Sequence, residues 1–312
     1  MKDCIIPVFI LCFVFCTCST SKKVIQVDES DTVSAYDIPE YVGPKKKLAI
    51  AKFENATRFG RRRLGENMTT VLTTELSKTQ RFILIERADV DKILDQLALA
   101  QSGITEGALQ QIQLLDADFI LTGAVTHYAV TTTGSSNLFT QSKTQKAEVG
   151  ADVRIIDVRT GEILLSESGK GITEKEFDKV LGMGEEGGYD ESLEMDAFRM
   201  AVINLTKNII STIDNTPWIC DVVKISGSHL YIDAGKKSNL SKGTVLNIYQ
   251  KGSPVTNLSG KVIGYEETWL GTGTISEFFG ADGAIVELDS ESGLSLPLFC
   301  RLAEKEELRE KE

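Results

Sequence analysis

The 312-residue sequence contains few of the side chains from which catalytic and metal sites are usually built. It has only two histidines, His127 and His229, which lie far apart and fall on separate predicted strands without a second imidazole or a cysteine at ligand spacing. Zinc sites and catalytic triads need several such groups to converge. We therefore interpret both histidines as ordinary strand or turn residues.

The common nucleophile and phosphate-binding motifs are missing as well. No serine lies in a Gly-x-Ser-x-Gly turn, and no glycine-rich loop ends in Lys-Ser or Lys-Thr. Residues 182–187 (GMGEEG) match the letters of a dinucleotide-binding turn, but Glu185 and Glu186 would repel a pyrophosphate, so we predict an acidic flexible loop. Asp289 and Glu291 lie in a serine-containing turn and are interpreted as solvated carboxylates. The sequence thus predicts no catalytic residue, metal ligand or cofactor.

Long hydrophobic runs are scarce. The run from Ile5 to Phe15 follows the positive Lys2 and is eleven residues long, whereas a membrane-spanning helix needs roughly 20 residues. This pattern is typical of an export signal that is removed from the mature protein. Residues 1–18 are therefore predicted to be a signal peptide.

Four of the six cysteines lie in that signal segment, at positions 4, 12, 16 and 18. Phe15-Cys16-Thr17-Cys18 is similar to a bacterial lipobox, in which the cysteine becomes the acylated first residue of the mature chain. We predict lipidation of Cys18, and acyl chains there would anchor the protein durably in a membrane. Thr17 replaces the usual small residue, which leaves Cys16 as an alternative, and plain secretion with cleavage near Ser19 is another.

A strongly basic surface is also absent. The net charge of −11 argues against nucleic acid and anionic lipid as partners, because phosphate binding depends on clustered Lys and Arg. The basic run Arg61–Arg63 is interpreted as a solvated helix edge. Residues 19–44 are polar and show no periodicity, which predicts a flexible tether.

The remaining residues predict two domains. Residues 45–214 are predicted to form an α/β sandwich, a mixed sheet with amphipathic helices, and residues 217–302 a small all-β barrel-like domain followed by a charged tail, 303–312. The first domain has predicted strands at 47–53, 82–86, 119–130, 149–157 and 163–171, and predicted helices at 64–76, 90–98, 109–115 and 198–214. Gly161 lies in the predicted hairpin turn between the last two strands, where a positive φ is needed.

Cys220 and Cys300 are the only thiols left after lipidation. They lie on the first and last predicted strands of the β domain, and these strands are neighbours if a small barrel closes. Since the exported chain would fold in an oxidising compartment, we predict a disulfide between them, with two buried free thiols as the alternative.

Several segments in order resemble one family over roughly residues 45–213. They are LAIAKF with the following Asn55, the helix GENMTTVLTTEL, FILIERADVDKIL, ADFILTG at 117–123 and VRIIDVRTGE at 153–162. This series resembles the curli production assembly/transport component family, CsgG-like lipoproteins. The resemblance implies a non-enzymatic lipoprotein at the periplasmic face of the outer membrane. It also implies that the chain assists assembly or secretion of surface structures by contact with envelope or secreted proteins, and that it forms a ring of identical copies.

Two alternatives remain within that resemblance, a ring with a transmembrane barrel and a periplasmic partner-binding lipoprotein of the cell-wall synthase activator or flagellar-base type. A barrel strand needs about 9–11 residues that alternate apolar and polar side chains. Residues 128–148 are rich in Thr and Ser, and residues 173–196 carry nine acidic side chains, whose burial in lipid is costly. The residues therefore argue against a spanning barrel, and we predict that 173–196 is a water-exposed loop.

Overall fold

The computed structural model describes residues 41–85, 116–136, 140–180, 183–184, 191–258, 262–289 and 294–303. These residues belong to one compact unit, Ile38–Glu312. The predicted signal peptide, the first part of the predicted tether, the predicted helices at 90–98 and 109–115 and residues 304–312 lie outside the described ranges. No helix within those ranges is both long enough and apolar enough to cross a membrane.

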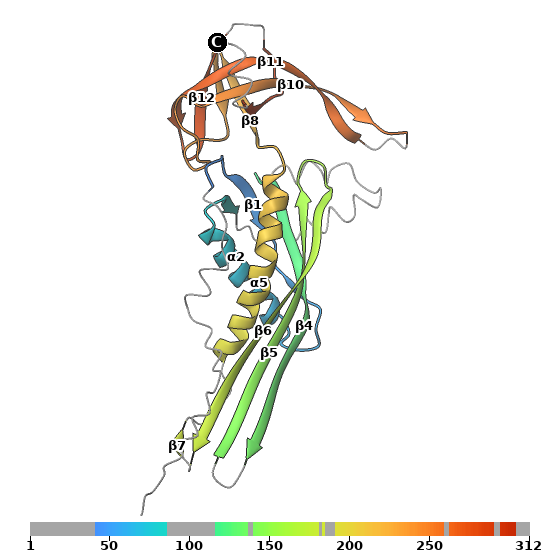
Figure 1. Cartoon of the computed structure of the whole chain (residues 1–312). Coiled ribbons are helices and arrows are strands. Elements are labelled where there is room, and N and C mark those ends of the chain that lie inside the picture. The colour runs from blue at the N-terminus through green and yellow to red at the C-terminus, as the bar shows by residue number, and fades with distance from the viewer. Residues whose placement is uncertain are drawn as a thin grey trace, which may run out of the picture. The chain divides into compact units, whose positions relative to one another are not determined.

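The first sheet has seven strands in the order β3-β1-β4-β5-β6-β7, with β2 paired to β4 (Figure 1). β1 pairs in parallel with β3 and β4, whereas β4, β5, β6 and β7 pair antiparallel. The strand bounds are Lys46–Ile50 (β1), Glu54–Asn55 (β2), Phe82–Ile85 (β3), Phe119–Ser136 (β4), Thr140–Asp157 (β5), Ile163–Val180 (β6) and Met183–Gly184 (β7). The predicted mixed sheet is confirmed, and Gly161 has the expected positive φ of 70°.

Two helices, α2 (Arg63–Lys78) and α5 (Glu191–Asp214), supply the apolar stripes that cover this sheet. α2 follows the predicted spacing, and α5 begins earlier than predicted because Leu193 and Ala197 continue its buried face by another turn and more. Figure 1 shows α5 lying along β5 and β6. Fully buried side chains of the shared core are Leu48, Leu64, Met68, Leu72, Leu76, Phe119, Leu121, Val149, Val153, Phe198, Val202, Leu205 and Ile209.

The three central strands extend further than the sequence predicts. β4, β5 and β6 are each 18 residues long, and their pairing continues to Ser136↔Gln141 and Thr140↔Val180. The prediction of a loop at 173–196 is therefore wrong for 173–180, which belongs to β6, for 183–184, which forms β7, and for 191–196, which begins α5. The prediction of an acidic flexible loop at 182–187 is likewise wrong for Met183 and Gly184, which form β7. Residues 181–182 and 185–190 lie outside the described ranges. Charge suggested a loop, but pairing satisfies the backbone while charged side chains alternate toward water.

The second sheet has six strands, all antiparallel, in the order β10-β11-β12-β9-β8-β13. Because β13 also pairs with β10, the sheet closes into a barrel. The strand bounds are Ile219–Ser226 (β8), His229–Ile232 (β9), Val245–Thr256 (β10), Val262–Phe279 (β11), Gly283–Leu288 (β12) and Leu298–Leu302 (β13). The barrel interior is filled by Leu230, Ile232, Leu246, Ile248, Ala284, Val286 and Cys300. An all-β part after the α/β part was predicted and is confirmed.

Candidate functional site

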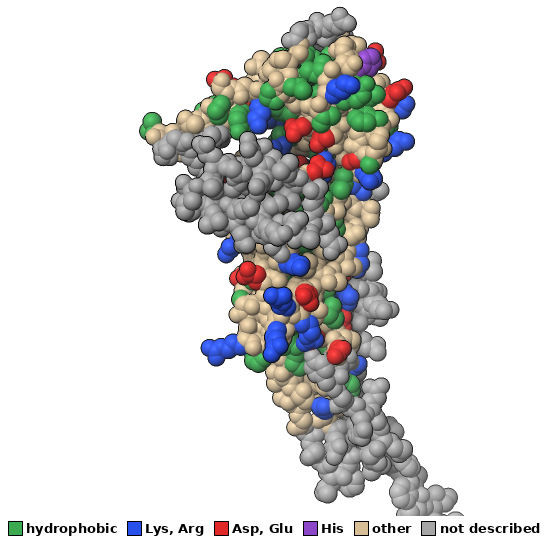
Figure 2. Space-filling model, turned by 180° about the vertical axis from the view of Figure 1, so that it is seen from behind, with side chains coloured by type: hydrophobic (Ala, Val, Ile, Leu, Met, Phe, Trp, Pro, Cys, Tyr) green, Lys and Arg blue, Asp and Glu red, His purple; other side chains and the backbone are tan. Residues whose placement is uncertain are grey.

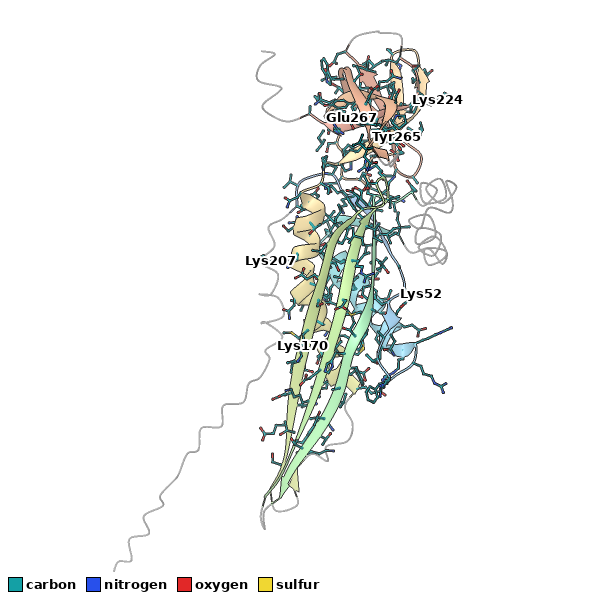
Figure 3. All side chains as sticks on the ribbon, turned by 90° about the vertical axis from the view of Figure 1, so that its right-hand side faces the viewer. Lys52, Lys170, Lys207, Lys224, Tyr265 and Glu267 are labelled. Carbon is teal, nitrogen blue, oxygen red and sulfur yellow. The ribbon has the colours of Figure 1, made fainter. Side chains whose placement is uncertain are left out.

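The strongest candidate for a functional surface is the side of the first sheet that faces away from α5. Strand alternation buries Ala147, Val149 and Val153 beneath the helices and directs the intervening residues to the opposite side. We call this opposite side the open face; its polar residues include His127, Ser142, Thr144, Lys146, Glu148, Lys170, Glu174 and Glu176, from β4, β5 and β6, and the exposed Ile172 lies on it opposite Glu148. Lys170 on β6 is labelled in Figure 3.

Glu148 lies at the centre of a network of charges on the open face. Its carboxylate oxygens lie 3.0 Å from Lys146 Nζ and 3.0 Å from Lys170 Nζ, and 3.7 Å from His127 Nε2. Hydrogen bonds from Lys146 and Lys170 lower the pKa of Glu148 to about 2. The bond to Glu148 in turn raises the pKa of Lys146. Glu148 and Lys146 are therefore ionised at neutral pH, and they present charges of opposite sign on this face.

The network continues toward the far end of the strands. Lys146 Nζ lies 3.6 Å from Glu174, and the Ser142 hydroxyl donates a hydrogen bond of 3.0 Å to Glu176. Beside Glu148 lies an open cavity of about 370 Å³, which His127, Asp152 and Lys170 help to line. Such a surface offers donors and acceptors to another polar surface.

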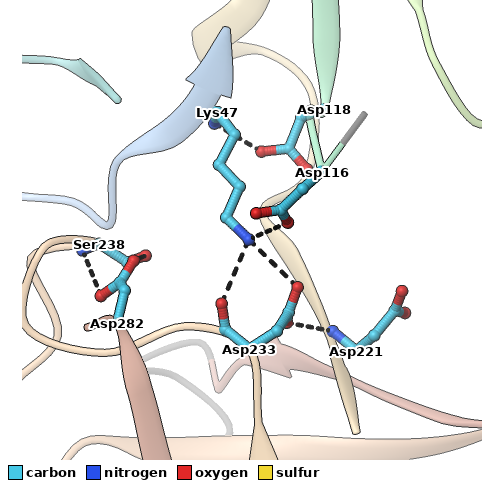
Figure 4. Close-up of polar contacts among 7 residues, drawn as sticks. All are labelled: Lys47, Asp116, Asp118, Asp221, Asp233, Ser238 and Asp282. Atoms are coloured by element: carbon cyan, nitrogen blue, oxygen red, sulfur yellow. Dashed lines mark hydrogen bonds and ion pairs between the residues drawn. The ribbon is translucent and has the colours of Figure 1, made fainter. Parts of the chain in front are cut away.

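A second polar cluster links β1 to the second sheet (Figure 4). The Lys47 ammonium lies 2.7 Å from Asp116 and 3.2 Å from Asp233, which follows β9. Burial opposes the charged form, but the carboxylates of Asp233 and Asp116 outweigh it and raise the pKa of Lys47 above its usual value. The Asp233 carboxylate also accepts a hydrogen bond of 2.8 Å from the Asp221 backbone N–H.

Around this cluster lies a cavity of about 480 Å³ lined by residues of both sheets, including Lys45, Asp118, Asp221 and Lys251. Burial raises the pKa of Asp118, and burial together with Asp233 raises the pKa of Asp221. Sequence reasoning missed this cluster because Lys47 and Asp233 are separated by 186 residues. We interpret it as a structural link, since Lys47 occupies its centre.

The chain just before β1 also contacts the second sheet. The Lys45 backbone N–H donates a hydrogen bond of 2.9 Å to the Ser238 carbonyl, and the Asn239 side chain donates one of 2.9 Å to the Gly43 carbonyl. Ser238 is held by Asp282, whose carboxylate accepts its backbone N–H and its hydroxyl at 3.1 and 2.7 Å (Figure 4). The last residues of the predicted tether are therefore ordered by these contacts.

The remaining residues singled out from sequence are not brought together. His127 is on β4 and His229 at the start of β9, both exposed, and the Ser228 hydroxyl lies 3.5 Å from His229 Nδ1. Asp289 accepts a hydrogen bond from the Thr272 hydroxyl, whereas Glu291, Cys16 and Cys18 lie outside the described residues. Within the described ranges, no three His, Cys, Asp or Glu side chains are placed to hold a metal ion.

Cys220 and Cys300 lie directly opposite each other on β8 and β13. Both are buried and both are free thiols. Burial, and then the neighbouring Cys300, raise the pKa of the Cys220 thiol. The disulfide between them stays a prediction.

The surface seen from behind the view of Figure 1 carries charges of both signs. Figure 2 shows Lys and Arg side chains beside Asp and Glu side chains on that face, without a field of one sign. A mixed surface of this kind does not favour a polyanion as partner.

Comparison with known proteins places this geometry in a family. The family model described as curli production assembly/transport component CsgG matches residues 29–237, about two thirds of the chain. The chain belongs to this family. The match covers the first sheet with the open face and also β8 and β9 of the barrel, which is further than the resemblance noted from sequence.

A relative in Neisseria meningitidis serogroup B is named "Putative lipoprotein NMB1126/NMB1164". It is 28% identical over 200 residues, which cover 61% of this chain and 86% of the relative. Among solved structures, lipoprotein GNA1162 of Neisseria meningitidis is 18% identical with a TM-score of 0.28, covering 55% of this chain and 99% of that one. A PelC dodecamer from Paraburkholderia phytofirmans is 14% identical with a TM-score of 0.30, covering 53% and 90%. TM-scores this low do not support an inference about the function of this chain.

Proposed function

We propose that this chain is a non-enzymatic envelope lipoprotein that acts in the assembly or secretion of surface or envelope structures by binding other proteins. Its membership of the curli assembly and transport family supports this class of function. Lipidation at Cys18, attachment to the periplasmic face of the outer membrane and assembly of several copies into a ring are parts of the same proposal.

The observation that carries the proposal is the polar extension of β4, β5 and β6. Beyond Val130 the strands stay paired row by row, as in Thr131↔Lys146↔Glu174 and Thr133↔Thr144↔Glu176. This order is achieved with few apolar side chains, which favours a paired surface in water over one in lipid. A surface with charges held in fixed rows supports selective contact with another protein.

The same rows favour the partner-binding alternative over a membrane-spanning ring. The open face of the extension carries only polar and charged side chains in these rows, and Thr132, Gln145 and Lys175 interrupt the opposite face. A lipid-facing strand surface needs an apolar band, and charges in it are destabilising. We therefore propose a protein that binds partners in the periplasm and does not itself open a pore.

A genetic experiment tests this function. Deletion of the gene in the source bacterium is expected to remove a defined set of proteins from the surface or secreted fraction, measured by quantitative mass spectrometry. The wild-type gene and the Glu287→Lys variant, which changes an exposed side chain of β12, should restore that set, whereas Glu148→Lys should not. Unchanged surface and secreted fractions in the deletion strain would contradict the proposal.

Imaging then separates the two alternatives. Assemblies of the detergent-extracted protein that do not conduct ions in planar bilayers are expected. A large ring that conducts ions would support transport through a pore instead.

A further inference from the structure

The barrel carries a two-stranded ribbon, and no further strand among the described residues pairs with either of its edges. β10 pairs with β13 only over Leu246–Gln250, and β11 pairs with β12 only over Gly273–Phe279. β10 and β11 nevertheless stay paired with each other as far as Thr256↔Val262. Within the described part of the chain, residues 251–256 and 262–270 therefore have no other strand beside them; we call these two segments the ribbon. An isolated pair of strands is marginally stable in water, and a third strand would stabilise it.

The two edges of the ribbon differ. On the β10 side, Pro254 has no N–H to donate, and the Lys251 N–H is already bonded to the Pro297 carbonyl at 3.1 Å. These are the features with which proteins protect exposed edges. From residue 262 to 270 β11 contains no proline. Its edge is therefore the one that can accept an added strand.

Side chains on β11 are exposed and held in place. Tyr265 is 43% exposed and Trp269 51%, unusually high for aromatic residues on a strand. The Lys251 ammonium lies 3.9 Å from the centre of the Tyr265 ring, and the Trp269 indole N–H donates a hydrogen bond of 3.4 Å to Asn247. Preordered aromatic side chains lose little entropy on binding and often dominate interfaces.

Charge on the same segment indicates what would bind. Glu267 is paired with Arg301 at 2.8 Å, whereas the exposed Glu266 has no ion pair in the described residues (Figure 3 shows Tyr265 and Glu267). If the β11 edges of two copies of this chain paired around Glu266 and Glu267, these carboxylates would face those of the other copy. Like charges directly opposite each other destabilise a pair of strands. A strand with a Lys or Arg between apolar residues would instead pair with Glu266 and cover the aromatic rings.

We propose that the free edge of β11 binds an extended, basic segment of a partner protein as an added β-strand. Main-chain hydrogen bonds to residues 262–270 would provide affinity, and Glu266, Tyr265 and Trp269 would select a segment in which Lys or Arg alternates with apolar residues. This deepens the proposed partner-binding function but uses a surface separate from the open face. Failure of the experiment below would leave the assembly role untouched.

The probe is a fluorescein-labelled eight-residue peptide of alternating valine and lysine, titrated against the full protein in detergent and followed by anisotropy. We expect saturable binding that weakens at least tenfold when alternate peptide nitrogens of the probe are methylated, because N-methylation removes the strand donors. Replacing lysine by glutamate in the probe should also weaken binding at least tenfold.

Protein variants localise the site. Glu266→Lys and Trp269→Ala should each weaken binding about tenfold. Glu287→Lys is the matched control, since Glu287 is an exposed glutamate on β12, which is paired on both edges. Circular dichroism checks that each variant folds. Absence of saturable binding, equal binding of the N-methylated probe, or equal losses with Glu287→Lys and Glu266→Lys would overturn the proposal. Self-association that Trp269→Ala abolishes, without peptide binding, would also overturn it and assign the edge to a second copy.

Discussion

At the scale of single residues, Lys46 and Lys47 show how alternation along one strand gives neighbours opposite environments. Lys47 points to Asp116 and Asp233, and its pKa rises. Lys46 is 4% exposed, and its ammonium donates to the carbonyls of Ile213 and Thr216 at the end of α5. The last carbonyls of a helix lack intrahelical donors, so Lys46 caps α5. Even so, burial lowers the pKa of Lys46 to about 8.

The lowered pKa of Lys46 predicts a pH dependence of stability. Between about pH 8 and the usual lysine value the unfolded chain binds the proton and the folded chain does not, so the free energy of unfolding rises with pH in that window. The gain from this group is at most about 3 kcal/mol, from 1.36 kcal/mol per pKa unit. Because other groups titrate too, urea unfolding of wild type and Lys46→Met should be compared at pH 7.5 and 10.5. The wild-type advantage should grow; a constant difference would show that burial does not shift this lysine.

The cysteine pair gives a second residue-scale prediction. Directly opposite residues of antiparallel strands have Cα atoms about 4.5–5.5 Å apart, within the range that a disulfide bridges. In protein isolated from the periplasm we expect peptide mapping without reductant to find Cys220 linked to Cys300. Replacing both by serine should lower the free energy of unfolding by about 4 kcal/mol on the chain-entropy model of a loop this long. Recovery of both cysteines as alkylated thiols would exclude the bond.

At the scale of elements, the contact between α5 and β6 depends on glycine. A Cβ atom on Gly171 would lie 2.0 Å from the Ala197 carbonyl oxygen and 2.5 Å from the Ala201 nitrogen, both backbone atoms of α5. Since backbone cannot rotate aside, the helix would have to move away from the sheet. The glycine is thus what lets α5 lie directly on the strand.

Gly171→Ala is therefore expected to destabilise the fold by about 1–3 kcal/mol, the usual cost of overpacking. Gly134→Ala on β4 is the matched control, because its nearest atom, the Ser142 carbonyl oxygen, lies at an ordinary 3.7 Å. That change should be neutral or slightly stabilising, since glycine weakens strands. Urea midpoints of the two variants measure the difference, and equal midpoints would mean that α5 is not packed this closely.

Elements also show how far sequence could predict this fold. α2 and β3 were predicted almost to their bounds because they carry apolar residues at the period of their own structure. The ends of β4, β5 and β6 were missed because Thr, Ser, Lys and Glu carry no such period, and only cross-strand pairing orders them. The ion pairs of the open face and of the Lys47 cluster could not be predicted for the same reason, because their members lie on strands far apart in sequence.

At the scale of the whole molecule, the family domain and the barrel share one compact unit. Lys47 and the segment just before β1 tie the beginning of the first sheet to residues 233–239 of the second. The family match ends within that contact, at residue 237. A partner bound at the open face and one bound at the β11 edge would therefore contact a single body.

Anchoring of that body is predicted to depend on Cys18. A diacylated, N-acylated cysteine buries enough methylene groups for stable attachment to a membrane. In fractionated cells, Cys18→Ala should move the protein from the membrane to the soluble fraction and abolish incorporation of labelled palmitate. Cys16→Ala is the matched control and should leave both unchanged, since Cys16 would be removed with the signal peptide. If the effects are reversed, Cys16 is the acylated residue; if both variants stay membrane-bound and labelled, neither cysteine anchors the chain.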